Sequence, residues 1–231
     1  MKRICLHGPE STGKSTLGTR LAAELGCEVV PEYGRAYCEA HGTNIGRQEL
    51  IHIAQTQDAM NRAAAARASE LGAGFVLFDT DPLITAVWAD MMFGATPGYL
   101  RDGYFDSFKG FSDLYLLLDI DLPFVNDGLR VYAQPAERRQ FFDRCTLELV
   151  RNDVHYVRIQ GIGEARFAAA KAASTPPGYQ SMPAGRCPAV AATWCGFAAG
   201  ASGAGALRPQ PASAAIKHTP RAIRRSLMSV P

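Results

Sequence analysis

Eight residues near the start of the chain have the types and the spacing that hold phosphate groups. Residues 8–15 read Gly-Pro-Glu-Ser-Thr-Gly-Lys-Ser, which satisfies the pattern G-x-x-x-x-G-K-[ST]. In this pattern, consecutive backbone N–H groups and the start of a helix form a concave site for anionic oxygens. Lys14 would reach the outer phosphates of ATP, and the Ser15 hydroxyl would be a ligand of Mg²⁺. The expected nucleotide contacts are Gly8, Pro9, Glu10, Ser11, Thr12, Gly13, Lys14, Ser15 and Thr16.

The segments on either side of this loop predict the strand and the helix that such a site requires. Residues 3–7 form a short, mostly apolar run that suits a buried strand. Three leucines, Leu17, Leu21 and Leu25, recur at helical spacing after the loop. A strand, a glycine-rich loop and a helix in this order turn a pattern match into a structural prediction.

Two aspartates follow the apolar run at residues 75–78, which predicts a buried strand. Asp79 and Asp81 are two residues apart, so both carboxylates can face one cleft beyond the carboxyl end of the strand. We expect Asp79 to support Mg²⁺ and Asp81 to take a proton from a substrate hydroxyl. Two alternatives stay open: solvated carboxylates at a strand end, or Asp81 as the N-cap of a helix that begins at Pro82.

A second polar group follows a brief strand predicted at residues 27–31. Glu32, Tyr33 and Arg35 offer a carboxylate, an aromatic ring and a guanidinium group, which together could grip a nucleoside. We expect all three to contact substrate, and the residues alone do not choose between Glu32 and Asp81 as the base. The alternative is an ordinary polar connection with a surface ion pair.

Arginines follow the apolar run at residues 114–118, which also predicts a strand. Asp127 is expected to contact substrate, and Arg130 to act on the transferring phosphoryl group. Arg138 is expected to bind the nucleotide. Arginines on a segment that closes over a site can neutralise the charge of that group. The alternative is a basic, solvated start of a helix.

The predicted elements alternate between strands and helices, which favours an α/β protein with a parallel sheet of five strands. Strands are expected at residues 3–7, 27–31, 75–78, 114–118 and 154–159. Helices are expected at residues 16–25, 47–71, 83–92, 98–108, 136–151 and 164–173. Trp88 and residues 91–93 are interpreted as core rather than as contacts to a base.

The character of the sequence changes after residue 173. Residues 174–231 carry six basic and no acidic side chains, are rich in Ala, Gly and Pro, and show no steady helix or strand period. We expect one domain at residues 1–173 and an irregular, disordered tail at residues 174–231. Residues 1–173 hold 18 basic and 22 acidic side chains, a net charge of −4, so nucleic acid is not an expected partner.

The six cysteines include no C-x-x-C pair, which favours a reducing, cytoplasmic setting. No apolar run reaches the ~18 residues of a membrane span. We expect the chain to enter its first strand directly, without a secretory leader. We therefore expect a cytoplasmic protein without a membrane partner, whose partner is a small nucleoside substrate.

Several motifs taken together resemble the ribosylnicotinamide kinase domain of NadR-type proteins over about residues 1–173. They are the loop at residues 8–17, Glu32-Tyr33-Gly34-Arg35, Phe78-Asp79-Thr80-Asp81, Leu116-Leu117-Leu118, Asp127-Gly128-Leu129-Arg130, Glu137-Arg138, and Gly161 with Arg166-Phe167. The loop alone is unspecific, whereas the ordered combination is fairly specific. The family pairs this domain with a nucleotidyltransferase domain, and this sequence begins at the kinase strand, so we expect no adenylylation.

The resemblance implies a three-layer P-loop kinase fold and transfer of a phosphoryl group from ATP to the 5′-hydroxyl of nicotinamide riboside. The product would be nicotinamide mononucleotide, a step of NAD salvage. Two alternatives remain at this point: a P-loop kinase for another nucleoside or nucleotide, and an ATPase switch with no small-molecule acceptor.

Overall fold

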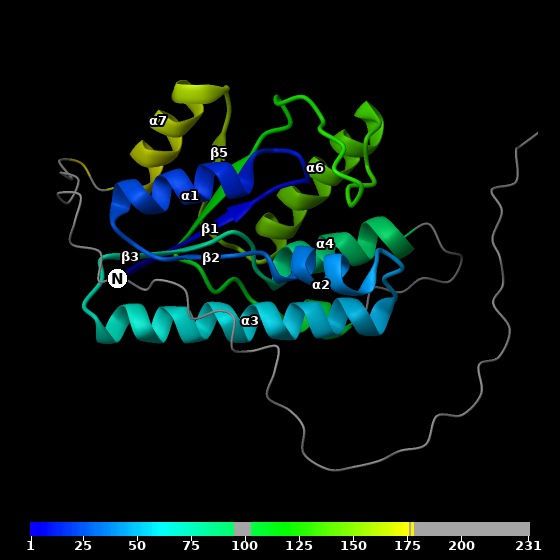
Figure 1. Cartoon of the computed structure of the whole chain (residues 1–231), viewed down its shortest axis with the longest axis horizontal. Coiled ribbons are helices and arrows are strands. Elements are labelled where there is room, and N and C mark those ends of the chain that lie inside the picture. The colour runs from blue at the N-terminus through cyan, green and yellow to red at the C-terminus, as the bar shows by residue number, and fades with distance from the viewer. Residues whose placement is uncertain (95–102, 176, 178–231) are drawn as a thin grey trace, which may run out of the picture. The chain divides into compact units, whose positions relative to one another are not determined.

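The computed structural model describes residues 1–94, 103–175 and 177, all of them within one structural unit, Met1–Val190 (Figure 1). The expected tail, apart from its first residues, lies outside the described residues, as does the first part of the helix expected at residues 98–108. The strands are β1 (Lys2–His7), β2 (Val29–Val30), β3 (Phe75–Phe78), β4 (Leu114–Leu118) and β5 (Tyr156–Ile159). The helices are α1 (Lys14–Leu25), α2 (Tyr33–His41), α3 (Arg47–Glu70), α4 (Pro82–Phe93), α5 (Gly103–Ser107), α6 (Pro135–Arg151) and α7 (Gly163–Ser174).

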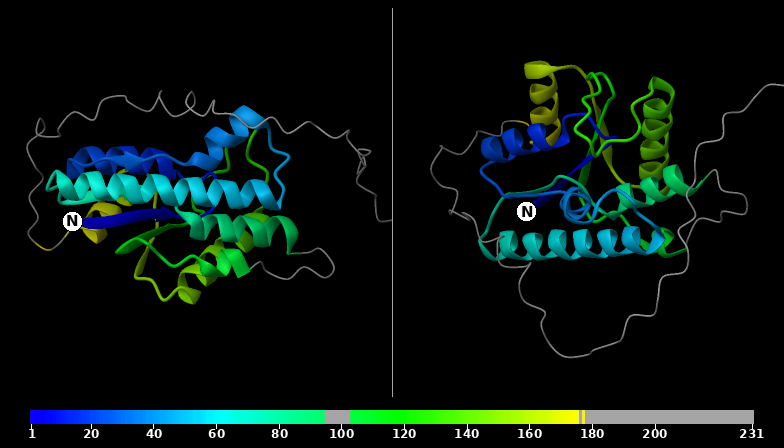
Figure 2. Two further views of the ribbon diagram at one scale, coloured as in Figure 1. Left: turned by 90° about the horizontal axis from the view of Figure 1, so that it is seen from below. Right: turned by 45° about the vertical axis from the view of Figure 1, so that its right-hand side comes forward.

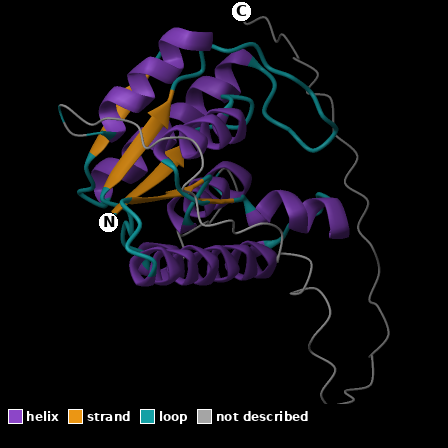
Figure 3. Ribbon diagram, turned by 60° about the vertical axis from the view of Figure 1, so that its left-hand side comes forward, coloured by secondary structure: helices purple, strands orange, loops and turns teal. Residues whose placement is uncertain are grey.

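The five strands form one parallel sheet in the order β2-β3-β1-β4-β5. Figure 3 shows the strands in orange between the purple helices. Apolar residues occupy both faces of the central strands, which explains why β3 and β4 read as continuous apolar runs rather than as alternating patterns. The carboxyl ends of β1 and β3 lie side by side, since Cys5 is in register with Phe78. The loop after β1 and the aspartates after β3 therefore meet at one edge of the sheet.

Helices cover both faces of the sheet and make a three-layer α/β fold (Figures 1 and 2). On one face, Ile4 and Leu6 pack with α1 and α7 around Leu21 and Phe167. On the other face, residues of β1, β3 and β4 pack with α3, α4 and α6. The expected fold class is confirmed.

The principal difference from the sequence prediction is α2. The prediction assigned no helix to the residues after β2, whereas Tyr33–His41 is helical. None of its residues is buried, so this helix adds little to the core. The second strand is also shorter than expected, because only Val29 and Val30 pair with β3.

Helix length and apolar content bear on membrane insertion. Across the described ranges, no helix combines the length and the apolar content that crossing a bilayer requires.

Candidate functional site

The loop at residues 8–15 joins β1 to α1 in a strand–loop–helix unit. Gly8 has a φ of 136°, and a Cβ there would lie 2.8 Å from the carbonyl oxygen of Leu118 on the neighbouring strand. Gly13 has a φ of 78° and sits at the N-cap of α1. Both positions therefore require glycine, which accounts for the two fixed glycines of the motif.

Lys14 lies over the loop that it follows. Its Nζ atom donates to the carbonyl oxygens of Gly8 at 2.9 Å and Pro9 at 2.7 Å. An ammonium group has three donors, so Lys14 can hold the loop and bind a phosphate oxygen at the same time. The buried hydroxyl of Thr12 also donates to the carbonyl of Pro9, at 2.8 Å, and braces the loop from inside.

The expected metal ligands lie together at the start of α1. The Ser15 hydroxyl donates to Oδ2 of Asp79 at 2.6 Å. The residue Asp79 is only 5% exposed. Its other carboxylate oxygen, Oδ1, is buried and has no hydrogen-bond partner among the described residues. A buried carboxylate oxygen needs a donor or a cation. A hydroxyl beside such a carboxylate matches the oxygen donors that Mg²⁺ prefers, so the residues fit this ion.

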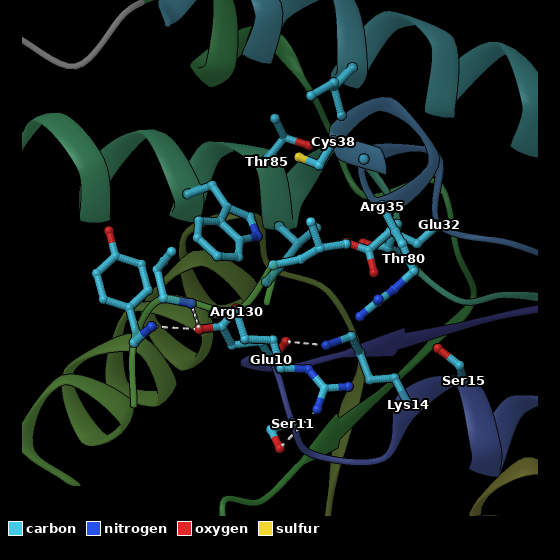
Figure 4. Close-up of a pocket in the computed structure, with 18 of the residues that line it drawn as sticks. Glu10, Ser11, Lys14, Ser15, Glu32, Arg35, Cys38, Thr80, Thr85 and Arg130 are labelled. Carbon is cyan, nitrogen blue, oxygen red and sulfur yellow. Dashed lines mark hydrogen bonds between the residues drawn. The ribbon is translucent and has the colours of Figure 1, made fainter. Parts of the chain in front are cut away.

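One cavity of about 490 Å³ extends from the phosphate loop to the helices beyond it (Figure 4). At one end it is lined by the loop and the first turn of α1, including Lys14, Ser15 and Thr16. At the other end it is lined by α2, α3 and α4. A cavity of this size suits a small ligand that is mostly buried.

Glu32 lies on the wall between the two ends of the cavity, with Arg35 and Thr80 nearby (Figure 4). Removal of the carboxylate from water raises its pKa. The charge of Lys14 opposes this change, and the charge of Asp79 adds to it. A carboxylate with a raised pKa at the wall of a cavity is suited to accept a proton from a ligand.

Asp81 lies elsewhere, 1% exposed and not on the cavity wall. Its Oδ1 accepts the backbone N–H of Leu83 at 3.0 Å, and its Oδ2 accepts the hydroxyl of Tyr115 at 2.5 Å. Asp81 is thus the N-cap of α4, with Pro82 in the first turn, as the open alternative anticipated. Burial raises the pKa of Asp81 to about 6, while the bonds from Tyr115 and Leu83 act in the opposite direction. Asp79 is also absent from the cavity lining and meets the site through Ser15, so the structure does not bring the two carboxylates to one cleft.

Glu10 fastens the arginine-bearing segment to the phosphate loop. Its Oε1 accepts the backbone N–H groups of Val131 at 2.9 Å and Tyr132 at 2.6 Å (Figure 4). Ser11 Oγ accepts from the guanidinium of Arg130 at 3.4 Å. Arg130 therefore lines the cavity next to the loop, as expected.

Asp127 links this segment to α2. It lies 3.0 Å from Nη1 of Arg35 and 3.3 Å from Nε of Arg130. Both arginines line the cavity and pair with this one carboxylate. Asp127 itself is not on the cavity wall, so it is placed to hold the arginines rather than to touch a ligand.

Two residues that were expected to contact a ligand do not line the cavity. The hydroxyl of Tyr33 lies 3.1 Å from Nε2 of His52, on the outer side of α2 and α3. The guanidinium of Arg138 donates to the carbonyl oxygen of Leu122 at 2.9 Å and is absent from the cavity lining.

The prediction missed most of the far wall of the cavity. Four residues of α4, Ile84, Thr85, Trp88 and Met92, share one face and line it. Trp88 packs edge-on against Phe141, in keeping with its interpretation as core, and it also lines the cavity. Their spacing of one, four and eight residues is the helical signal that could have identified this face.

A family model described as the AAA domain matches residues 3–166. The NadR proteins of Escherichia coli (strain K12) and Salmonella typhimurium (strain LT2) are trifunctional NAD biosynthesis/regulator proteins. Each is 28% identical to this chain over 163 residues, which cover 69% of this chain and 38% of the relative. The chain thus spans little more than a third of the curated relatives it matches.

Solved structures with similar folds include two of NadR. One, in complex with NR, has a TM-score of 0.61 at 22% identity and covers 78% of this chain and 53% of that one. The other, in complex with NAD and AMP-PNP, has a TM-score of 0.56 at 22% identity, with coverages of 74% and 48%. Thymidylate kinase from Ehrlichia chaffeensis has a TM-score of 0.52 at 13% identity, with coverages of 74% and 96%.

These comparisons confirm the resemblance stated from the sequence motifs and the P-loop kinase fold. The shared fold is compatible with the expected enzyme class, a P-loop phosphotransferase. The acceptor of the phosphoryl group and the roles of single residues are matters for proposal.

Proposed function

This chain belongs to the AAA domain family, and on that premise we propose that it transfers the terminal phosphoryl group of ATP to the 5′-hydroxyl of nicotinamide riboside. The product is nicotinamide mononucleotide. The observation that carries the proposal is the continuity of one cavity, with a phosphate loop at one end and the Glu32 carboxylate on the wall toward the other. The 28% identity with NadR, a NAD biosynthesis protein, supports a riboside as the acceptor.

The donor end holds the phosphates of ATP. The backbone N–H groups of the loop and the start of α1 bind the phosphate oxygens, and Lys14 offsets their charge. Ser15 and Asp79 would hold Mg²⁺, which supplies charge neutralisation at the phosphates. Arg130 lies beside the loop, where it offsets charge on the group in transfer.

The acceptor end suits a flat aromatic ring that carries a positive charge. Trp88 and Tyr132 both line the cavity, and their ring centroids lie 5.6 Å apart. Aromatic faces attract cations, at about 0.5–2 kcal/mol for each good contact. The nicotinamide ring of the riboside is a pyridinium cation, which this wall favours over a neutral base.

The reaction needs a base and two fixed reactants. Glu32 takes the proton of the 5′-hydroxyl as the oxygen–phosphorus bond forms and the bond to ADP breaks. The transition state of phosphoryl transfer is loose, so positioning and charge supply most of the acceleration. We assign Glu32 this role in preference to Asp81, because only Glu32 is on the cavity wall.

The proposed activity belongs to residues 1–173 and to the cytoplasm. Helix α7 ends at Ser174 and is tied to β1, since Nζ of Lys2 donates to the carbonyl of Ser174 at 3.0 Å. Removal of residues 178–231 by limited proteolysis should therefore leave turnover intact. Loss of turnover in step with that cleavage would contradict the assignment to residues 1–173.

The test is an incubation of the protein with ATP, Mg²⁺ and single acceptors, with the products identified by mass spectrometry. We expect phosphorylated nicotinamide riboside, with kcat/KM at least tenfold higher than for uridine or thymidine. Preferred phosphorylation of another nucleoside would support the kinase activity but contradict nicotinamide riboside as the acceptor. ATP hydrolysis that no acceptor stimulates would favour the ATPase alternative.

A further inference from the structure

We infer that two buried amide side chains of α3, Gln57 and Asn61, form a clamp that positions Glu32 relative to the phosphate loop. This inference rests on the proposed function, in which Glu32 is the base. It assigns positioning roles to two residues that the sequence motifs do not include. Neither residue needs to touch the reacting atoms for the clamp to work.

The first half of the clamp brackets Glu32 in the chain. Nε2 of Gln57 donates to the carbonyl oxygen of Pro31 at 3.1 Å. The backbone N–H of Tyr33 donates to Oε1 of the same amide at 2.7 Å. One side chain, 1% exposed, thus fixes the peptide groups on both sides of Glu32.

The second half connects this bracket to the end of β3. Oδ1 of Asn61 accepts from Nε2 of Gln57 at 3.1 Å, and Nδ2 of Asn61 donates to the carbonyl oxygen of Thr80 at 2.9 Å. Thr80 follows Asp79, whose carboxylate accepts the hydroxyl of Ser15. An unbroken series of bonds therefore runs from the base to the residues at the start of α1.

The surroundings of the two amides favour this role over a purely structural one. The buried face of α3 is otherwise apolar, with Ala54, Ala64 and Ala68 among its members. Amides in such a place cost stability unless they are bonded, and apolar residues of similar size would fill the space without that requirement. Gln57 lines the cavity, but both hydrogens of its Nε2 are engaged by Pro31 and Asn61, so this group has no hydrogen left to donate to a ligand.

Helix α2 explains why the bracket is needed. Tyr33 is the first residue of that helix, where a backbone N–H has no partner inside the helix. Glu32 directly precedes the helix, and its own side chain makes no capping bond there. Without Gln57, the segment that carries Glu32 would lose two hydrogen bonds to its backbone. A shift of about 1 Å in a catalytic group can lower the rate roughly 100-fold.

The test uses Asn61, because it is 0% exposed and is not on the cavity wall. Asn61→Leu removes the hydrogen bonds of Asn61 to Gln57 and to Thr80 while it keeps a similar side-chain volume. If the leucine variant fails to fold, Asn61→Ser, which has a shorter polar side chain, replaces it. Asn152→Leu is the matched control, since its amide bonds only within the end of α6. Each change is also made in a Glu32→Gln background.

We expect Asn61→Leu to lower kcat about tenfold or more while the KM for ATP stays within about twofold. In the Glu32→Gln background the same change should lower kcat by less than about threefold, because the base that the clamp positions is gone. Asn152→Leu should leave kcat within about twofold in both backgrounds. An equal loss from Asn61→Leu in both backgrounds would show a general structural effect and overturn the inference.

Hydrogen exchange at the Tyr33 amide gives a readout that does not depend on activity. We expect this amide to exchange at least tenfold faster in Asn61→Leu than in the wild type, with amides of α6 unchanged. Unchanged exchange at Tyr33 would overturn the clamp whether or not the protein is a kinase. A wild-type protein that phosphorylates no acceptor would instead reject the proposed function, and the exchange measurement would still decide the clamp.

Discussion

The two ends of the cavity are built from the chain in different ways. The phosphate end comes from one continuous segment, residues 8–16, between β1 and α1. The acceptor end is assembled from α2, α3, α4 and Tyr132, which are far apart in the sequence. Local backbone geometry is sufficient for the first, whereas the second exists only once the helices have packed. The phosphate end should therefore control catalysis with any acceptor, and the acceptor end should control which acceptor is used.

The largest effect is expected at the phosphate end, from Lys14→Ala. Loss of this charge should lower kcat by about 1,000-fold for every acceptor, because the phosphates are common to all of them. Lys109→Ala, at an exposed position, is the matched control and should leave kcat unchanged. The measurement is single-turnover kinetics on variants whose circular dichroism matches the wild type. A folded Lys14→Ala protein with wild-type kcat would contradict the assignment.

The phosphate end of the cavity could be predicted from the sequence, whereas most of the acceptor end could not. Gly8, Gly13 and Lys14 could be assigned because their roles depend on backbone angles and spacing within one loop. Trp88 and Gln57 could not, because nothing in their own segments shows that α3 and α4 would face the same cavity. The strands β3 and β4 were predicted to the residue, since continuous apolar runs mark buried parallel strands.

Asp81 shows a further limit of the sequence. A carboxylate two residues beyond Asp79 fits a catalytic pair and a helix cap equally well until the partner Tyr115 is known. That partner lies 34 positions along the chain. The choice between the two interpretations depends on tertiary packing, which spacing alone does not report.

The next effect concerns Glu32, where the two ends of the cavity meet. Glu32→Gln should lower kcat about 100-fold while the KM for ATP stays within about twofold, because only the proton acceptor is lost. In the wild type, kcat/KM should fall as the pH drops through the raised pKa of Glu32, above the ordinary range of a glutamate. The variant should lack this acidic limb. A pH profile of identical shape in both proteins would rule out Glu32 as the base.

A smaller effect, confined to the acceptor, is expected from Trp88→Ala. Loss of the aromatic face should raise the KM for nicotinamide riboside about tenfold, roughly the value of one cation–aromatic contact. The KM for ATP should stay the same, and Trp88→Phe should recover part of the loss. Steady-state kinetics with each substrate varied in turn is the measurement. Equal increases in both KM values would mean that Trp88 supports the fold rather than the acceptor.

Asp81→Asn should have the smallest effect on catalysis and a distinct effect on stability. Burial raises the pKa of Asp81 to about 6 from 3.8, so the folded state favours the neutral acid. That contribution is fully present below pH 3.8 and is lost as the pH rises through about 6. Asparagine stays neutral at every pH. The free energy of unfolding of the variant, relative to that of the wild type, should therefore rise by on the order of 2 kcal/mol between pH 4 and pH 7.

Urea unfolding across that pH range measures the difference in stability. We expect kcat of Asp81→Asn within about threefold of the wild type, because its carboxylate is not on the cavity wall. A loss as large as that of Glu32→Gln would transfer the role of base to Asp81. A stability difference that does not change with pH would contradict the raised pKa.

The central claim is that one cavity brings the terminal phosphate of ATP to a nucleoside hydroxyl. The most direct test counts ADP and phosphorylated nicotinamide riboside in the same reaction, sampled over time with the wild-type protein and Mg²⁺. The account predicts equal amounts of the two products at every time point and almost no ADP when the riboside is left out. ADP that accumulates at the same rate with and without the riboside, and without phosphorylated riboside, would contradict it.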